Sequence, residues 1–162
     1  FDMLGMVILV VIQTIRAMKM AVKNKLLEHR AYTDAHTGLP NKRACKELLI
    51  NKEIIKEPTA CIMFDLNNLK TVNDTMGHSA GDQLIMNFAR LLRSVIPEKD
   101  FVGRYGGDEF MAVMYHTSRT EVEEILKCLC LEKDRLNNRE SASVKCWFLL
   151  FFYRYQNQKS GN

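Results

Sequence analysis

A short glycine-rich stretch between two apolar segments strongly limits how this chain can fold. The segment Phe101–Val102 precedes Gly106-Gly107-Asp108-Glu109, and the run 110–115 (FMAVMY) follows. Two β-prone runs joined across adjacent glycines predict a β-hairpin, with left-handed turn geometry expected at the glycines. Asp108 and Glu109 lie at the tip, where adjacent carboxylates repel each other unless a cation is near. The pattern alone leaves two interpretations open, a solvated acidic turn and a cation site.

A further acidic residue lies at the end of a predicted buried strand. The short apolar run 59–66 (TACIMFDL) is bounded by Pro58 and by Asn67-Asn68, which predicts a buried strand. Asp65 lies at the exit of this strand, where a carboxylate suits a hard cation better than it suits a core. A Mg²⁺ site uses one or two carboxylates together with substrate phosphates. Asp65 and Asp108 meet this need if the hairpin lies beside the 59–66 strand.

Four motifs together resemble those of diguanylate cyclase (GGDEF) domains. In chain order they are 34–43 (DAHTGLPNKR), 64–70 (FDLNNLK), 72–82 (VNDTMGHSAGD) and 104–110 (RYGGDEF). The resemblance covers about residues 31–140 and is specific, because four spaced motifs agree in order. It implies a nucleotidyltransferase that condenses two GTP molecules to cyclic di-GMP plus two pyrophosphates, for bacterial second-messenger signalling. It also implies a homodimer in which each subunit presents one GTP.

The resemblance assigns the catalytic and metal-binding roles. Asp65, Asp108 and the Leu66 carbonyl correspond to the ligands of two Mg²⁺ ions per active site, for which Mn²⁺ is a substitute. Asp108 is also the candidate proton acceptor, and Glu109 stays open between a metal ligand and a supporting position. Lys70 corresponds to a lysine that contacts GTP phosphates and would stabilise charge on the transferred phosphate. Without the resemblance, a lone lysine at this position is typical of a solvated surface.

The remaining site residues are expected to bind the substrate. Gly106 and Gly107 belong to the hairpin tip, where the bare backbone lets a bulky ligand approach. Asn73 and Asp82 correspond to guanine-binding residues, and an amide with a carboxylate suits the donors and acceptors of that base. Taken alone, Asn73 is typical of a helix end and Asp82 of the first turn of a helix.

The N-terminal part predicts a membrane-linked helix. Residues 3–15 are almost wholly apolar and uncharged, and Arg16, Lys19, Lys23 and Lys25 follow at once. Because the chain begins inside this run, we expect residues 1–15 to be the end of a transmembrane helix of a longer protein. The basic residues then place the catalytic domain on the cytoplasmic side of an inner or cell membrane. The alternatives are a signal-peptide core and an amphipathic packing helix.

Residues 16–33 are predicted to form a linker helix that carries a signal to the domain. Apolar residues follow one another at spacings of three and four, at Ile15, Met18, Val22 and Leu26. Such a stripe fits a parallel two-helix stalk, and it also fits a single helix packed on the domain. In GGDEF proteins a helix at this place commonly links a sensor to the catalytic domain.

Three further helices complete the predicted fold. Asn41 predicts the N-terminal cap of a helix that runs to about Lys56. The stretch 79–96 predicts a strongly amphipathic helix, and Ser118-Arg119-Thr120-Glu121 is a capping box for a helix to about Leu136. The fold class is therefore α+β. We expect an antiparallel-containing sheet like that of nucleotide cyclases and polymerase palms, covered on one side by helices and preceded by the N-terminal helix.

The C-terminal part departs from the family pattern. After Val144 the family has a patterned strand and a final helix, whereas this chain has an apolar block at 147–153 followed by polar residues. We therefore expect an incomplete GGDEF domain at 34–144 and an atypical tail at 145–162, with weak or no activity; a strand from Ala142 to Phe152 could still form. The alternative function is a catalytically inactive GGDEF module that binds GTP or dimerises as a signal-transmitting domain.

Composition and one further motif limit the partners. The net charge is only +4, and without a Lys/Arg block the sequence does not predict nucleic-acid binding. Five cysteines without C-x-x-C spacing argue against a zinc site or a disulfide scaffold and fit a reducing compartment.

Family members with product feedback carry Arg-x-x-Asp before the hairpin. Here Asp100 is in place but Pro97 occupies the arginine position, so we expect no product inhibition through that site.

Overall fold

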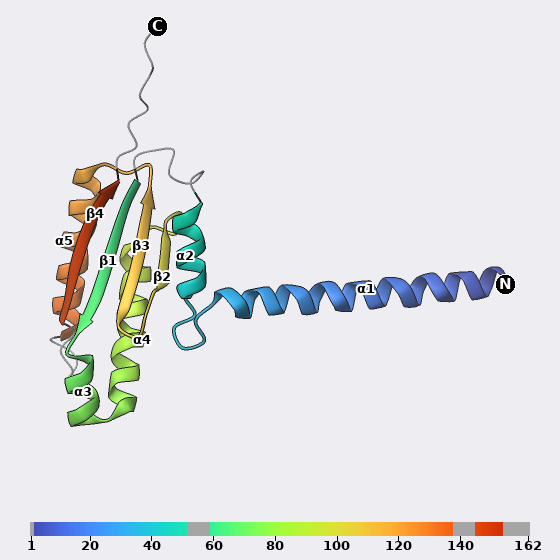
Figure 1. Ribbon diagram of the computed structural model, residues 1–162, viewed down its shortest axis with the longest axis horizontal. Helices are drawn as coiled ribbons and strands as arrows, with labels where there is room; N and C mark the ends of the chain where they lie inside the picture. Colours follow the sequence, from blue (N-terminus) through green and yellow to red (C-terminus); the bar gives the residue numbers. More distant parts are fainter. Residues whose placement is uncertain (1, 52–58, 138–144, 154–162) are drawn as a thin grey trace, which may run out of the picture.

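A computed structural model describes residues 2–51, 59–137 and 145–153 as an α+β domain with a long helix projecting from it (Figure 1). The elements are α1 (Met3–Tyr32), α2 (Lys42–Ile50), β1 (Thr59–Asn67), α3 (Leu69–Met76), α4 (His78–Val95), β2 (Phe101–Arg104), β3 (Glu109–Tyr115), α5 (Arg119–Asn137) and β4 (Lys145–Tyr153). This order confirms the predicted fold class, the N-terminal helix and the hairpin.

The sheet has four strands in the order β2-β3-β1-β4, and each neighbouring pair is antiparallel. β1 lies in the centre, with the hairpin on one side of it and β4 on the other. In the β1–β3 pair, Asp65 lies opposite Glu109 and Phe64 opposite Phe110. The expectation that the hairpin lies beside the 59–66 strand is therefore confirmed.

The main core lies between one face of the sheet and the helices α4 and α5. Alternate residues of β1 point into it because successive side chains of a strand face opposite sides, and Phe64 is 1% exposed. The Phe88 ring of α4 packs edge-on against the rings of Phe64 and Phe110, at centroid distances of 6.1 and 5.0 Å. The α4 stripe is buried as its helical spacing predicted, at Leu84, Ile85, Phe88, Leu91 and Leu92.

A second, smaller core on the opposite face corrects the expectation that helices cover only one side. Cys45 of α2 packs there against Met111 and Val113 of β3. After Glu109, β3 is apolar without interruption, which is typical of a strand buried on both faces. Burial raises the pKa of the Cys45 thiol to about 11, so this cysteine is a protonated core residue rather than a reactive group.

Side chains at the predicted caps fix the ends of two helices. Asn41 Oδ1 accepts from the amides of Arg43 and Ala44, while its Nδ2 donates to the Ala31 carbonyl at 2.9 Å. One side chain thus joins the end of α1 to the start of α2. At α5 the capping box is confirmed, since the Ser118 amide donates to Glu121 Oε2 at 2.7 Å and the Glu121 amide donates to Ser118 Oγ at 3.3 Å.

One helix end differs from its prediction, and other predicted boundaries lie outside the described residues. α2 ends at Ile50 with Asn51 as its C-cap, so the prediction that the helix continues through Asn51 to about Lys56 is wrong. Residues 52–58 are outside the described part of the chain. β4 forms the expected further strand and pairs with β1 along its whole length. The predicted boundary at Val144 and the residues after Tyr153, where we expected no final helix, are outside the described ranges.

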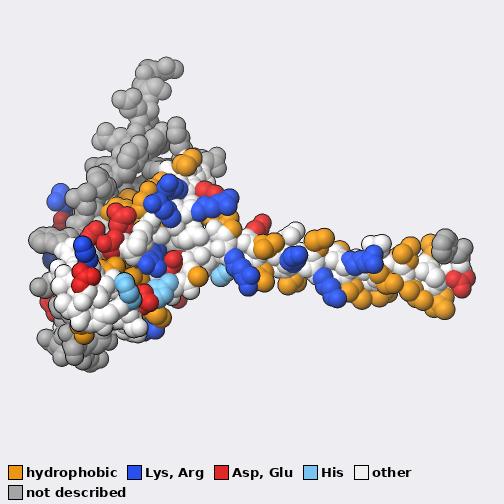
Figure 2. All heavy atoms as spheres, turned by 60° about the horizontal axis from the view of Figure 1, so that its bottom comes forward, with side chains coloured by type: hydrophobic (Ala, Val, Ile, Leu, Met, Phe, Trp, Pro, Cys, Tyr) orange, Lys and Arg blue, Asp and Glu red, His pale blue; other side chains and the backbone are white. Residues whose placement is uncertain are grey.

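α1 is one continuous helix that runs from the first predicted N-terminal segment, 1–15, into the second, 16–33. Its 30 residues span about 45 Å at the usual rise per residue, and none of them is buried. Apolar and basic side chains are exposed along it (Figure 2). By length and composition it could cross a membrane, although a signal sequence near an N-terminus satisfies the same criteria.

Candidate functional site

Arg104 holds the tip of the β2–β3 hairpin from one side. Its Nε donates to the Gly106 carbonyl at 3.1 Å and its Nη2 to the Gly107 carbonyl at 2.7 Å. Its Nη1 donates to Asp34 Oδ1 at 3.1 Å, and the two side chains are 14% and 24% exposed. A guanidinium presents several donors in a fixed planar arrangement. The tip is therefore fixed by charge-assisted bonds to its backbone.

The turn geometry expected at the two glycines is wrong, because neither Gly106 nor Gly107 has a positive φ. The connection between β2 and β3 comprises residues 105–108, longer than the two-residue turns that need left-handed residues. Gly106 leaves room for the Glu109 side chain: a Cβ there would lie 2.6 Å from Glu109 Oε2, so a larger residue would require that carboxylate to move. Around Gly107 nothing lies within 4 Å of such a Cβ, so this backbone is open to a ligand.

The acidic residues of the predicted metal site gather at one end of the β1–β3 pair. Asp65 lies opposite Glu109 in the strand register, and the Leu66 amide donates to the Asp108 carbonyl at 3.0 Å. Within the described residues, no group of three or more His, Cys, Asp or Glu side chains could hold a metal ion. Two carboxylates and a carbonyl instead fit a hard cation whose other ligands are substrate phosphates. Their role as metal ligands stays a prediction.

Lys70 is placed close after the strand that carries Asp65. β1 runs almost directly into α3, and Asn68 between them adopts a left-handed conformation with φ 65°. Lys70 lies in the first turn of α3 and is exposed. The lysine is therefore anchored at the strand end where the acidic residues gather, as a phosphate contact requires.

The structure brings Asn73 beside the first turns of α4, which carry Asp82. Gly77, with φ 86°, joins α3 to α4. Gly81 is buried, and a Cβ on it would clash with Asn73 Oδ1, so the Asn73 amide lies directly against the backbone that precedes Asp82. The Asn73 side chain predicted to bind guanine thus lies next to the backbone position of its predicted partner, Asp82.

The turn between α1 and α2 contains contacts that the sequence interpretation missed. Asp34 Oδ1 accepts from the Thr37 hydroxyl at 2.7 Å and from its amide at 2.8 Å, in addition to Arg104. His36 Nε2 lies 3.2 Å from the Asp82 carbonyl oxygen. These partners are 70 and 46 residues apart in the chain. The one sequence signal for these contacts is that the motif 34–43 contains polar side chains that packing in a core does not explain.

The hydrogen bonds to Asp34 make one contribution to stability pH-dependent. Burial by itself would raise the pKa of Asp34, but bonds from the Thr37 side chain and backbone and from Arg104 lower it below the ordinary 3.8. The stabilisation that the ionised carboxylate provides is therefore complete above pH 3.8 and is lost as the pH falls through the lower folded-state pKa.

We expect the free energy of unfolding to fall as the pH is lowered below about 4, and to fall less steeply in Asp34→Asn. Urea unfolding between pH 7 and pH 3 measures both slopes. Asp134→Asn, at an exposed position of α5, is the matched control and should keep the wild-type slope. Equal slopes in wild type and Asp34→Asn would contradict the assignment.

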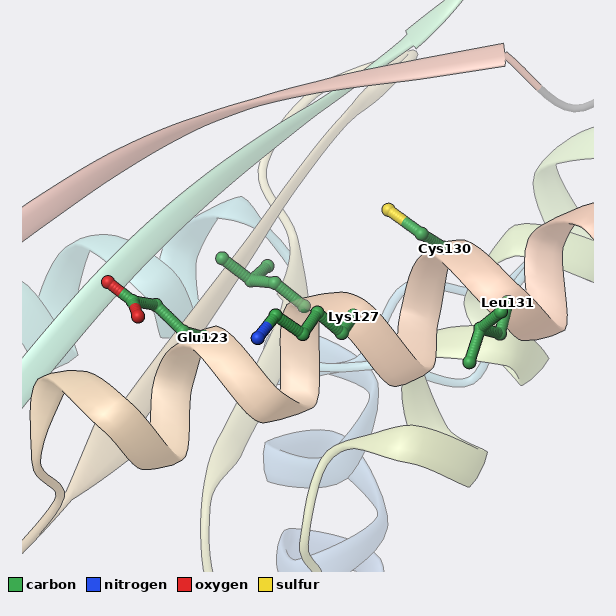
Figure 3. Close-up of a pocket in the computed structure, with 5 residues that line it drawn as sticks. Glu123, Lys127, Cys130 and Leu131 are labelled. Atoms are coloured by element: carbon green, nitrogen blue, oxygen red, sulfur yellow. The ribbon is translucent and has the colours of Figure 1, made fainter.

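A hollow on α5 lies apart from all these motif residues. It has a volume of about 550 Å³ and is lined by Glu123, Leu126, Lys127, Cys130 and Leu131. Figure 3 shows the labelled side chains projecting from this one helix. Most of the exposed surface of its lining is apolar, which does not match the chemistry of a nucleoside triphosphate, so the hairpin tip and its neighbours stay the candidate site.

Comparison with known proteins gives the same family as the motifs. The family model described as "Diguanylate cyclase, GGDEF domain" matches residues 31–145. A diguanylate cyclase of Vibrio cholerae serotype O1 is 36% identical over 91 residues, which cover 54% of this chain and 28% of that protein. The cyclic di-GMP phosphodiesterase PdeB of Shewanella oneidensis is 31% identical over 121 residues, which cover 72% of this chain and 14% of that protein. The chain spans less than a third of the length of either relative.

Solved structures agree on the fold. The coiled coil and GGDEF domain of DgcB from Caulobacter crescentus, in complex with c-di-GMP, matches with a TM-score of 0.80 and 23% identity, covering 90% of this chain and 82% of that chain. At this identity the likeness shows the fold alone. The family match includes β1, the α3–α4 pair and the hairpin tip, and it covers well over half of the sequence. The chain therefore belongs to the GGDEF domain family.

Proposed function

We propose that this chain is the catalytic part of a diguanylate cyclase, which condenses two GTP molecules to cyclic di-GMP. The observation that carries the proposal is the pairing of β1 with β3, which puts Asp65 at the same end of the sheet as the intact Gly-Gly-Asp-Glu tip. The α3–α4 pair, which follows β1 directly in the chain, carries Asn73 and Asp82. A phosphate-binding half and a base-binding half are thus carried by adjoining elements.

Each step of the proposed reaction forms one P–O bond and breaks another. The 3′-oxygen of one GTP attacks the α-phosphorus of the other, pyrophosphate leaves, and Asp108 accepts the proton of the hydroxyl. Lys70 stabilises the negative charge that builds up on the transferred phosphate. Two repetitions close the ring and release two pyrophosphates.

Members of the family generally use divalent metal ions, and we propose Mg²⁺ here, two per site, with Mn²⁺ as a substitute. Asp65, Asp108 and the Leu66 carbonyl would hold the ion, because hard cations prefer carboxylate and carbonyl oxygens. When bound, the cation would polarise the α-phosphate and lower the pKa of the attacking hydroxyl. Glu109, opposite Asp65 in register, is placed to bind the same cation or to support its ligands.

The chemistry calls for two subunits, and α1 offers a way to pair them. Each subunit holds one GTP, so two sites must face each other for both bonds to form. The apolar stripe of α1 is exposed along its length, with Ile15 at 48%, Met18 at 69% and Val22 at 70%. We propose that two copies of α1 form a parallel stalk through this stripe. Residues 1–15 are proposed to be the end of a transmembrane helix, with the domain on the cytoplasmic side.

A second candidate function is a GGDEF module that binds GTP or dimerises without turnover. The similarity to the phosphodiesterase PdeB favours it, because that protein contains a matching segment although its name gives the opposite activity. The atypical residues after Val144 favour it as well. The intact tip favours the cyclase.

The test is to incubate the purified protein with GTP and Mg²⁺ and to look for cyclic di-GMP by mass spectrometry, with ATP as the control nucleotide. The proposal expects cyclic di-GMP from GTP, at a low rate because the residues after Val144 depart from the family pattern, and none from ATP. Tight GTP binding with no product would favour the inactive module.

The residues before the hairpin lead us to propose that product does not bind at the family's feedback site. Pro97 has no guanidinium for bidentate phosphate binding. Asp100 is only 7% exposed, and its Oδ1 already accepts from the Tyr115 amide at 3.0 Å, so it acts as a buried structural residue. Calorimetry with cyclic di-GMP should show no binding that depends on Asp100. Tight binding that Asp100→Asn eliminates at unchanged thermal stability would contradict this.

A further inference from the structure

One turn of the chain contacts both halves of the proposed site. The turn between α1 and α2 reaches the hairpin tip through Asp34, whose carboxylate binds Arg104. Two residues later, His36 reaches the first turns of α4 and contacts Asp82. Histidine and acidic side chains adjoin on the face of the domain in Figure 2. The base-binding half therefore has a neighbour that the predicted set of site residues did not include.

The contact between His36 and Asp82 involves both the backbone and the side chain of the aspartate. His36 Nε2 lies 3.2 Å from the Asp82 carbonyl oxygen and 3.7 Å from its Oδ1. A carbonyl oxygen can only accept, so Nε2 must carry a proton and donate it. The same N–H group faces the carboxylate. The His36 side chain is 33% exposed and that of Asp82 is 62% exposed, so the imidazole is the more enclosed of the two and the carboxylate stays open to a ligand.

We propose that His36 is a positioning residue for guanine recognition, which holds Asp82 in the orientation that accepts hydrogen bonds from the base. The inference rests on the proposed function, in which Asp82 binds guanine. His36 does not contact the base in this scheme. It restrains the backbone of Asp82 through the carbonyl and limits the rotation of its carboxylate through the nearby N–H group.

Guanine makes such a restraint useful because of the arrangement of its donors. N1–H and the N2 amino group point the same way, so a carboxylate can accept from both only when its plane is aligned with the base. Asn73 packs against Gly81 and fixes the backbone just before Asp82. His36 fixes the Asp82 carbonyl that follows. The carboxylate thus lies between two restraints that come from different elements, α3 and the α1–α2 turn.

This geometry predicts a specific pattern of nucleotide preference. Inosine lacks the N2 amino group, so it makes one of the two bonds and depends less on carboxylate alignment. In His36→Ala we expect the affinity for GTP to fall about three- to tenfold, as the loss of about one neutral hydrogen bond implies. The affinity for ITP should fall less, so the preference for GTP over ITP shrinks. KM should rise while kcat changes little, because the interaction is equal in ground and transition states.

The experiment measures GTP and ITP binding to the full chain by calorimetry, and KM and kcat where turnover is measurable. His36→Gln is the rescue variant, since its amide can donate to the same carbonyl. His116→Asn is the matched control at an exposed histidine outside the site, where asparagine tolerates the local φ of 50°. Asp82→Ala reports separately on the guanine site.

The expected result is a weaker GTP preference in His36→Ala that is largely restored in His36→Gln and unchanged in His116→Asn. Equal affinities in His36→Ala and wild type, or equal losses for GTP and ITP, would overturn the inference. If Asp82→Ala weakens GTP binding but His36→Ala does not, only the positioning role fails. If neither variant changes GTP binding, the guanine site itself fails and this inference with it.

Discussion

Asp65→Asn and Asp108→Asn are each expected to abolish cyclic di-GMP formation while leaving the domain folded. Asp65 is exposed and Asp108 half-buried, so neither side chain supports the core. Asparagine keeps the shape but removes the negative charge that a divalent cation requires, and at position 108 it also removes the proton acceptor. Loss of one charge-stabilising group in a transition state typically slows turnover by a factor on the order of a hundred to a thousand, and the loss of the cation adds to this.

The effect of these two substitutions on activity is measured as initial rates with GTP and Mg²⁺, and their effect on stability as the unfolding temperature. Asp134→Asn on α5 is the matched control, because its carboxylate is 68% exposed and lies on an element outside the site. A normal rate in either site variant at unchanged expression would refute the metal assignment. Glu109→Gln belongs in the same series. A raised requirement for Mg²⁺ identifies Glu109 as a ligand, whereas a lower rate at unchanged Mg²⁺ requirement places it in a supporting position.

Arg104→Ala is expected to reduce both stability and turnover. The guanidinium is largely buried and donates to the Gly106 and Gly107 carbonyls and to Asp34. Hydrogen bonds to charged groups contribute roughly 1.5–3 kcal/mol each. After allowance for relaxation and residual solvent, we expect a loss of about 2–4 kcal/mol in the free energy of unfolding. Turnover should fall about a hundredfold, because a displaced tip no longer aligns the reacting groups.

The comparison with two other variants separates geometry from charge. Arg104→Lys keeps the charge but cannot reach three acceptors in one plane, so most of the loss should persist. Arg119→Ala removes an exposed ion pair with Glu123, whose side chains are 79% and 49% exposed, and should cost at most about 0.5 kcal/mol. Urea unfolding and initial rates give both quantities. If Arg104→Ala behaves like Arg119→Ala, the guanidinium does not organise the tip.

Sequence patterns between residues close together in the chain predicted much of the fold. The spacing of apolar residues gave α4, because a helix that covers a sheet must present one apolar face. The capping box gave the start of α5, since both of its partners lie within four residues. The apolar run 59–66 gave β1, and its pairing with the hairpin placed Asp65 beside the acidic tip as expected.

The contacts that organise the site could not be predicted in the same way. Asp34 meets Arg104, and His36 meets Asp82, across separations that leave no periodic signal in the sequence. The left-handed geometry predicted at Gly106 and Gly107 was wrong because adjacent glycines do not reveal the length of the loop, and the four-residue connection 105–108 does not need positive φ at these positions. α2 was predicted too long because its apolar spacing continues past Ile50, while the helix ends in a backbone cap at Asn51.

The most direct measurement is the stoichiometry of the reaction of wild-type protein with GTP and Mg²⁺. Chromatography with mass spectrometry should show two GTP consumed for each cyclic di-GMP formed, with two pyrophosphates released, and a rate per subunit that rises with protein concentration as dimers form. Binding of GTP without cyclic di-GMP or pyrophosphate, in protein whose unfolding transition shows an intact domain, would contradict the cyclase and leave the inactive GGDEF module as its function.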